Sequence, residues 1–337
     1  MPGWYYRVRH SFQAGITPVY NNMPGIVVFI RSMAFFGDQL VTYPLLHQLN
    51  KLYPRSPITV VAHDPVEQHY THLPWVHCFV QANDWWEKYR AIPVGTDIVI
   101  ALHHSSEQYA LLAAAKRIRS RLGFKNKRAF DFVWSHAHKK DINDYIGLAN
   151  LQLLNTLHAF DPMEAARGCI QWLAGQKTGR TEHTDVMFMV GGGAGAFKRW
   201  GVPNYIALAD RLIQHMGPQT TFTFVLGPAE EEELSQLKAL NRSEFKLLVS
   251  RPLSEIADLA LHAKLIVAND CGPSHIAQNA CVPYVGLFNE ANPEWFWQRS
   301  NTRAVIPDGP VLDIQRITVE QVEQACVAVM NFSVTAP

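Results

Sequence analysis

The feature that most constrains the fold is an alternation of short apolar runs with longer segments of helical period. In the first half of the chain, the apolar runs lie at residues 26–30, 58–62, 76–80 and 97–102. Between the first two runs, apolar side chains recur at helical spacing from Val41 to Leu52. Uninterrupted apolar strands separated by helices predict a parallel sheet that is covered by helices on both faces.

The alternation stops after the first half and then returns. Residues 142–175 are mostly of helical period, and residues 175–185 are polar with turn residues, which is typical of a linker. Further apolar runs lie at 186–190, 221–226 and 246–249, and on either side of a polar turn at 269–275. Near the end of the chain, Thr318 and Gln321 have the spacing of a capping box, which predicts a last helix.

We therefore predict two doubly wound α/β domains. The expected segments are an N-terminal extension at 1–24, a first domain at 25–175, a linker at 176–185, a second domain at 186–316, and a C-terminal helix and tail at 317–337. Folds of this kind bind ligands at the carboxyl ends of their strands. We expect the two sheets to direct those ends towards a shared cleft.

The composition excludes several classes of protein. With 48% hydrophobic and 18% charged residues, the chain is typical of folded globular proteins, and its net charge of +1 argues against a nucleic-acid binder. The cysteines are scattered without a Cys-x-x-Cys pair, which indicates reduced thiols. The N-terminus lacks the apolar core of a secretory signal, and no apolar run reaches the roughly 18–20 residues that span a membrane. We expect a cytoplasmic protein.

The segment AKLIVANDCGPSHIAQNACVPYVGLF joins two apolar runs through an unusual turn. Pro273 suits the first position of a helix, and Gly272 lets a ligand approach the backbone. The free amides of the helix start, with Ser274 and His275, would then favour an anion such as a diphosphate. Asp270 would repel phosphate, but it is suited to accept hydrogen bonds from sugar hydroxyls. The turn predicts a nucleotide-sugar site, and the alternative is an ordinary turn in which Asp270 caps the helix.

The turn segment VANDCGPSHIAQNACVPYVGLF resembles the signature of glycosyltransferase family 9, the bacterial heptosyltransferases of lipopolysaccharide core assembly. Four other segments resemble motifs of the family in the same order: FFGDQLVTYPLLHQLNKLYPRSPITVV, IALHHSSEQYALLAAAKRIRSRLGF, FKRW and VLGPAEEEEL. The similarity extends from about residue 25 to residue 330.

The resemblance implies a GT-B fold, in which two Rossmann-like domains face each other across the active site. The N-terminal domain would hold an acidic glycolipid acceptor, and the C-terminal domain a nucleotide-sugar donor, usually ADP-heptose. The family inverts the anomeric centre and requires no metal or other cofactor. The sequence agrees with the last point, because no two aspartates stand at positions i and i+2 and the Asp-x-Asp metal motif is absent.

An inverting transfer needs a base for the acceptor hydroxyl and a positive charge for the departing diphosphate. The resemblance places the base at Asp38; the alternative is that Asp38 caps a helix. Lys198 ends the glycine-rich stretch GGGAGAFK and would neutralise the diphosphate, unless it is a solvated surface lysine. Glu230 would accept hydrogen bonds from ribose hydroxyls, although a glutamate run is also typical of a solvated first helical turn. The expected donor-binding residues are Lys198, Glu230, Asp270, Gly272, Ser274 and His275.

The segment AKRIRSRLGFKNKR carries basic residues and no acidic residue. We expect Arg117, Arg119 and Arg121 to bind the acidic acceptor, and the segment to allow peripheral contact with the cytoplasmic face of the inner membrane. The alternative is a plain solvated basic face.

The chain also departs from the family pattern. After the last apolar strand the family usually has Phe-Gly-Pro-Thr-x-Pro, whereas residues 288–293 read FNEANP, which leaves the transferred sugar open. The bulky residues MAFF before Gly37 and the N-terminal extension are further departures.

Two other functions remain open. An NAD-dependent dehydrogenase or epimerase would require a Gly-x-Gly-x-x-Gly motif after a leading strand, and none is present. A non-catalytic, lectin-like relative would have no use for Asp38, Lys198, Asp270 and His275 together.

Overall fold

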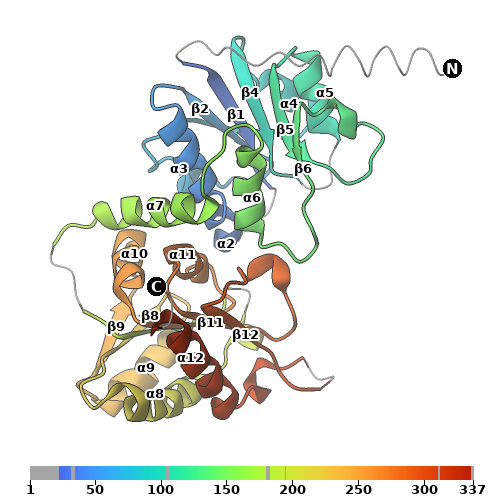
Figure 1. Ribbon diagram of the computed structural model, residues 1–337. Helices are drawn as coiled ribbons and strands as arrows, with labels where there is room; N and C mark the ends of the chain where they lie inside the picture. Colours follow the sequence, from blue (N-terminus) through green and yellow to red (C-terminus); the bar gives the residue numbers. More distant parts are fainter. Residues whose placement is uncertain are drawn as a thin grey trace. The chain divides into compact units, whose positions relative to one another are not determined.

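The computed structural model describes residues 23–31, 35–103, 107–179, 183–193, 195–309 and 312–334. The chain forms two compact units, Met1–Ala165 and Ala166–Pro337. The division falls inside helix α7 (Pro162–Gly175), and each unit contains one parallel six-stranded sheet (Figure 1).

The sheet of the first unit has the strand order β3-β2-β1-β4-β5-β6. Its strands are β1 (Gly25–Phe29), β2 (Ile58–Ala62), β3 (Val76–Gln81), β4 (Thr96–Ala101), β5 (Ser120–Phe124) and β6 (His136–His138). The connecting helices are α2 (Phe36–Leu40), α3 (Tyr43–Leu52), α4 (Trp85–Arg90), α5 (Gln108–Ala115) and α6 (Ile146–Asn155). Short 3₁₀ turns lie at Glu67–His69 and Asp131–Val133.

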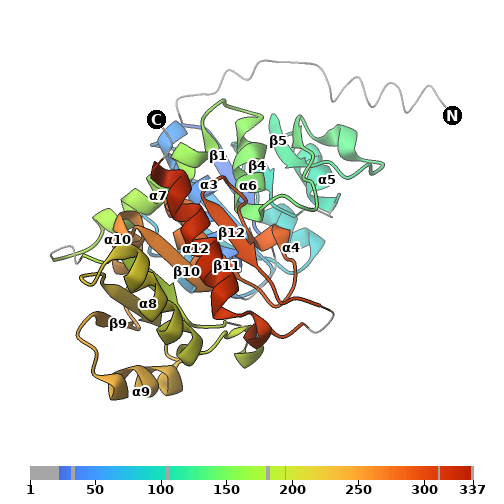
Figure 2. The ribbon, with the colours of Figure 1, turned by 60° about the horizontal axis from the view of Figure 1, so that its bottom comes forward.

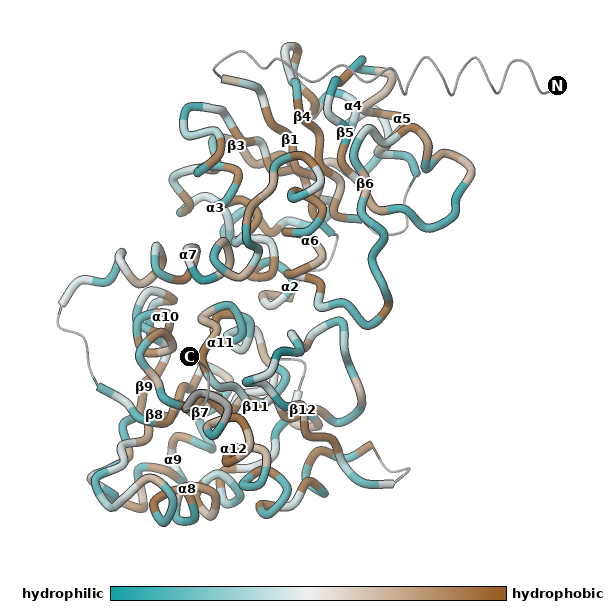
Figure 3. Tube along the Cα trace, in the orientation of Figure 1, coloured by the Kyte–Doolittle hydropathy of each residue, from teal (hydrophilic) through white to brown (hydrophobic). Residues whose placement is uncertain are grey.

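Both faces of the sheet are buried at its central strands. Val27 and Phe29 pack with Tyr109 of α5 in one core, while the alternate residues Ile26 and Val28 are equally buried on the other face. The apolar colour of β1 and β4 in Figure 3 reflects this double burial. The continuous apolar runs of these strands follow from it, because neither of their faces meets water.

The sheet of the second unit has the order β12-β11-β10-β7-β8-β9. Its strands are β7 (Val186–Met189), β8 (Phe222–Leu226), β9 (Phe245–Val249), β10 (Leu265–Asn269), β11 (Tyr284–Leu287) and β12 (Thr302–Val305). The helices are α8 (Val202–Met216), α9 (Glu231–Leu240), α10 (Leu253–His262), α11 (Ser274–Ala280) and α12 (Val319–Val334). Short 3₁₀ turns lie at Ala196–Lys198, Pro293–Trp295 and Ile314–Arg316.

Helices α8 and α12 lie side by side on one face of the second sheet (Figure 2). Phe188, Phe222 and Phe224 of the strands pack into their shared core. Trp200, just before α8, is fully buried there, and its Nε1 donates to the carbonyl of Ile317 at 2.7 Å.

The prediction of two α/β halves is confirmed, and so is the capping box. The amide of Thr318 donates to Gln321 Oε1 at 2.8 Å, and the amide of Gln321 donates to Thr318 Oγ1 at 3.2 Å. The sequence did not reveal β5, β6 or β12. Strand β5 (SRLGF) carries an arginine and a serine, so it has no apolar run to mark it.

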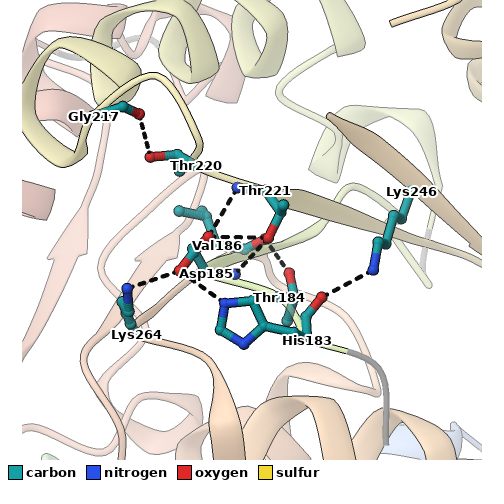
Figure 4. Close-up of polar contacts among 9 residues, drawn as sticks. All are labelled: His183, Thr184, Asp185, Val186, Gly217, Thr220, Thr221, Lys246 and Lys264. Carbon is teal, nitrogen blue, oxygen red and sulfur yellow. Dashed lines mark hydrogen bonds and ion pairs between the residues drawn. The ribbon is translucent and has the colours of Figure 1, made fainter. Parts of the chain in front are cut away.

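The amino end of β7 is fixed by the carboxylate of Asp185 (Figure 4). Oδ1 accepts from Lys264 Nζ at 2.9 Å, and Oδ2 accepts from the Thr221 amide at 2.9 Å and from its hydroxyl at 3.0 Å. These contacts join the starts of β7, β8 and β10. Burial alone would raise the pKa of Asp185, but the bonds from Lys264 and Thr221 lower it to about 2.

Replacing Asp185 with Asn should lower the free energy of unfolding by about 2 kcal/mol at pH 7, because the folded state holds this carboxylate charged. Because the pKa of Asp185 is lower in the folded state, the carboxylate stabilises the protein at pH values above its ordinary pKa of 3.8. This contribution disappears as the pH falls from 3.8 towards 2. Urea denaturation of the whole chain measures both effects. The matched control is Asp210→Asn, which removes an exposed pair with Arg242 and should cost less than about 1 kcal/mol. Equal losses in the two variants would contradict the role given to Asp185.

Candidate functional site

In the second sheet, the direction in which successive strands are added reverses between β7 and β10. Strands β8 and β9 lie on one side of this point, and β11 and β12 on the other. In open parallel sheets, ligands bind outside the carboxyl ends of the strands at such a switch point, because the loops diverge there and leave space. The glycine-rich loop follows β7, and the turn at 270–273 follows β10, so both predicted donor segments reach this place.

The two strand ends are tied together by Asn269, the last residue of β10. Its side-chain Nδ2 donates to the carbonyl of Val190 at 2.7 Å, and its Oδ1 accepts from the Tyr205 hydroxyl at 2.9 Å. All three residues are buried. Asn269 therefore sets the spacing between the loop after β7 and the turn after β10.

Lys198 and Asp270 form an ion pair across the switch point. The glycine loop folds back on the lysine: a Cβ on Gly192 would lie 2.9 Å from the carbonyl oxygen of Gly195 and 3.2 Å from Lys198 Cβ. Gly195 has a φ of +134°, in the region that favours glycine. Lys198 is 23% exposed and is held by its partner, so it is not a plain solvated lysine, and Asp270 is not the cap of α11.

Glu230 lies at the end of the loop after β8 and is 7% exposed. Its Oε2 accepts from the amide of Gly227 at 2.7 Å, and its Oε1 accepts from Arg199 Nη2 at 3.3 Å. Of the glutamate run, Glu231 and Glu232 are the exposed first turn of α9, whereas Glu230 is turned into the site. Glu230, Lys198 and Asp270 all act electrostatically on the buried thiol of Cys271, which places these three charges around one point.

The helix start at α11 differs from the prediction of free amides. The amides of Ser274, His275 and Ile276 donate to the carbonyls of residues 271–273 at 3.0–3.2 Å. The Ser274 hydroxyl donates to the carbonyl of Cys271 at 2.7 Å. The tight turn uses these donors itself, so the expectation that they are available to a diphosphate is wrong.

His275 is buried beside the ion pair, and its ring lies 5.5 Å from that of Trp295. Burial lowers the pKa of His275 to about 4; Asp270 acts to raise it and Lys198 to lower it further. The imidazole is therefore neutral at pH 7. It offers no positive charge to a bound anion.

The loop at 288–301, where the sequence departs from the family pattern, is built on Gln278 of α11. Gln278 Nε2 donates to the carbonyl of Trp295 at 3.0 Å, and its Oε1 accepts from the amide of Trp297 at 2.6 Å. Arg299 Nη1 donates to the carbonyl of Gln278 at 2.8 Å. This loop is thus a fixed border of the turn that carries His275.

In the first unit, Asp38 lies in the short helix α2, after the carboxyl end of β1, and is 7% exposed. The residue at the cap position of α2 is Phe35, so Asp38 does not serve as the cap. Gly37, the residue before it, lies inside the same helix and does not have left-handed backbone geometry. Asp38 also acts on the buried Tyr70, whose pKa is raised, mainly by burial.

His103 is a residue that the sequence did not single out. It follows β4, next to the end of β1, at the switch point of the first sheet. Its ring stacks on that of Tyr109, with the two ring centres 4.5 Å apart. Lys88 Nζ lies 5.5 Å from the centre of the Tyr109 ring. Burial, with smaller contributions from the charges of Lys88 and Arg31, lowers the pKa of His103 to about 4, although a hydrogen bond with the backbone of Ile30 acts to raise it. Its position after a central strand was the one signal in the sequence that could have identified it.

The three predicted acceptor arginines do not lie near Asp38 along the sheet. Arg117 and Arg119 are exposed, but they precede β5, at the opposite edge from the end of β1 that leads to Asp38. Arg121 is buried, and its guanidinium donates to the carbonyls of Val133 at 2.8 Å and Ile118 at 2.6 Å. The expectation that Arg121 faces an acceptor is not met, because β5 draws it into the interior.

Among the residues that the structure describes, no group of three or more His, Cys, Asp or Glu side chains is arranged to hold a metal ion. No helix among those residues is long and apolar enough to cross a membrane.

Residues 93–308 match the profile of glycosyltransferase family 9 (heptosyltransferase), which is more than half of the chain. The chain belongs to this family. Two curated relatives are lipooligosaccharide heptosyltransferase 2 of Haemophilus ducreyi, 25% identical over 86% of this chain and 91% of the relative, and that of Haemophilus influenzae, 23% identical over 83% and 88%. Family 9 membership makes the protein a glycosyltransferase of the heptosyltransferase type.

Solved structures of family 9 share the fold. The chain resembles E. coli ADP-heptose lipopolysaccharide heptosyltransferase II, with a TM-score of 0.57 and 19% identity over 92% of this chain and all of the other. It resembles E. coli heptosyltransferase WaaC with ADP-2-deoxy-2-fluoro heptose, with a TM-score of 0.62 and 17% identity over 89% and 98%. The predicted GT-B fold is confirmed.

The fold alone does not choose the reaction. A UDP-GlcNAc 2-epimerase from Methanocaldococcus jannaschii also resembles the chain, with a TM-score of 0.53 and 12% identity over 91% of this chain and 93% of the epimerase. It is the family 9 profile that separates this chain from the epimerases.

Proposed function

We propose that this protein is an inverting, metal-independent transferase that moves heptose, or a related sugar, from a nucleotide-sugar to a lipopolysaccharide or lipooligosaccharide core acceptor. ADP-heptose is the first candidate donor, because one E. coli protein that shares the fold is an ADP-heptose heptosyltransferase and another was solved with ADP-2-deoxy-2-fluoro heptose. A lipooligosaccharide-type acceptor is the first candidate because the Haemophilus relatives are lipooligosaccharide heptosyltransferases.

The observation that carries the proposal is the grouping of Lys198, Asp270, Glu230 and His275 at the switch point of the second sheet. A lysine beside a neutral imidazole suits the diphosphate, and the two carboxylates suit hydroxyls of the sugar and the ribose. A Rossmann-type NAD enzyme would instead require a glycine-rich dinucleotide turn, which the sequence lacks.

In the proposed reaction, an acceptor hydroxyl attacks the anomeric carbon from the face opposite the diphosphate. Asp38 takes the proton of that hydroxyl, and the new carbon–oxygen bond forms. The bond between the anomeric carbon and the diphosphate oxygen breaks, and the oxygen leaves with the electron pair. Lys198 stabilises the charge that develops on the diphosphate.

An anionic group on the acceptor would suit the first unit at the end of β4. Arg31 and Lys88 both act electrostatically on His103 there, so positive charge accumulates at the same edge as Asp38. We propose this edge, rather than the arginines at 117–121, as the acceptor side. Peripheral contact with the inner membrane is part of the proposal, since the acceptor is a glycolipid.

Replacing Asp38 with Ala should lower kcat by about 10²–10⁴-fold, the usual contribution of a general base. The affinity for ADP should stay within about twofold, because Asp38 touches the acceptor and not the donor. A sugar-transfer assay and calorimetric titration with ADP measure the two quantities. A large loss of ADP binding would contradict the assignment of Asp38 as the base.

Replacing Lys198 with Ala should weaken ADP binding at least about tenfold, because the diphosphate loses its counter-charge and meets an unpaired Asp270. The matched control is Lys238→Ala, an exposed lysine of α9 in the same unit.

Titration of the wild-type protein with ADP, UDP, GDP and NAD tests the identity of the donor nucleotide. Preference for UDP or GDP would discard ADP-heptose, and NAD binding would favour a dehydrogenase or epimerase. A folded protein that binds no nucleotide would point to a non-catalytic relative.

Treatment with EDTA should leave the transfer rate unchanged, because Lys198 supplies the charge that a divalent cation provides in other transferases. The rate is measured before and after chelation, and after addition of Mg²⁺ or Mn²⁺. Activity that disappears with EDTA and returns with either ion would overturn the proposed mechanism.

A further inference from the structure

Arg199 occupies the position between Lys198 and Trp200, and the proposed reaction gives it no role. Its guanidinium reaches across to the loop after β8. Nη1 donates to Glu233 Oε1 at 2.8 Å, and Nη2 donates to the carbonyl of Ala229 at 3.2 Å and to Glu230 Oε1 at 3.3 Å. The arginine fork therefore ties the lysine loop to the loop that carries Glu230.

The carboxylate of Glu230 lies against two glycines, where a side chain would crowd it. A Cβ on Gly191 would lie 3.0 Å from the carboxylate, and one on Gly227 would lie 2.8 Å from its Oε2. The two glycines belong to the loops after β7 and β8. These loops and the arginine together hold Glu230 in one orientation. Each of its oxygens has a second lone pair, so it can still accept a hydroxyl.

The charge of Glu230 needs a partner in this place. Asp270 lies near enough for both carboxylates to act on Cys271, and a bound diphosphate would add further negative charge. Lys198 is already paired with Asp270. Arg199 supplies the positive charge that offsets Glu230, and its side chain is only 20% exposed, so water screens this pair weakly.

We propose that Arg199 is a positioning residue that orients Glu230 to accept hydrogen bonds from the ribose hydroxyls of the donor nucleotide. This inference rests on the proposed function. It adds a residue that sets the preference for ribose over deoxyribose in the donor nucleotide, through Glu230 and without touching the nucleotide itself. The arginine fork, with its two nitrogens on two glutamates, is a geometry that lysine cannot reproduce.

The test compares ADP with 2′-deoxy-ADP by calorimetric titration of the full chain. The wild-type protein should prefer ADP by about tenfold, the usual cost of leaving a buried acceptor without its hydroxyl. Glu230→Gln should remove most of that preference, and Arg199→Ala should remove it to a similar extent. Arg199→Lys, which keeps the charge and is the milder change, should lose the preference in part.

The matched control is Arg211→Ala. Arg211 also pairs with two glutamates in the same unit, but it lies on α8 and its partners Glu320 and Glu323 lie on α12. This variant should keep the full preference for ADP, even if its melting temperature falls as much as that of Arg199→Ala. A structural role alone would change the melting temperature and leave the ADP to 2′-deoxy-ADP ratio unaltered.

The outcomes separate this inference from the proposed function. If ADP binds and Glu230→Gln loses the preference while both Arg199 variants keep it, Arg199 does not position Glu230. If Glu230→Gln also keeps the preference, Glu230 does not contact the ribose and the inference is wrong. If the wild-type protein binds no ADP, the donor assignment fails, and the inference fails with it.

Discussion

The geometry of the second unit depends on one buried amide, that of Asn269. Its Oδ1 accepts a hydrogen bond from the Tyr205 hydroxyl, and its Nδ2 donates one to the carbonyl of Val190. Both bonds lie just beyond the last residue pair of the ladder between β7 and β10. A smaller apolar residue there would leave the buried carbonyl of Val190 without this hydrogen bond, at about 1–3 kcal/mol, and the Tyr205 hydroxyl with its longer bond to the carbonyl of Met189 at 3.4 Å. This one side chain therefore fixes the spacing between the two loops that carry Lys198 and Asp270.

Much of the fold could be predicted from the sequence, because strands buried on both faces must be apolar throughout. The meeting of Lys198 and Asp270 at one edge of the second sheet could be predicted as well, since each follows such a strand. Their meeting follows from topology: in a doubly wound sheet the first and fourth strands become neighbours, so their loops share one edge. The resemblance to family 9 supplied Asp38, which no local pattern separates from a helix cap.

The rest depended on contacts that no local pattern contains. Arg121 stands in a run of basic residues, yet the carbonyls of Ile118 and Val133 hold it in the interior. Its strand was missed because period and hydropathy cannot mark a strand with a buried arginine. The amides at the start of α11 were expected to be free, but they donate to the carbonyls of residues 271–273 in the same turn. Arg199 could not be predicted, since its partners lie 30–34 positions away.

Strand β7 is anchored at both ends, by the carboxylate of Asp185 at its start and by the amide of Asn269 beyond its end. The frame of the proposed nucleotide site is therefore complete when the chain folds. A ligand that enters a rigid frame loses little conformational entropy on the side of the protein. The second unit should behave as a preformed receptor, in which discrimination between donors depends on the loops at 191–199 and 288–301 and not on closure of the sheet around the ligand.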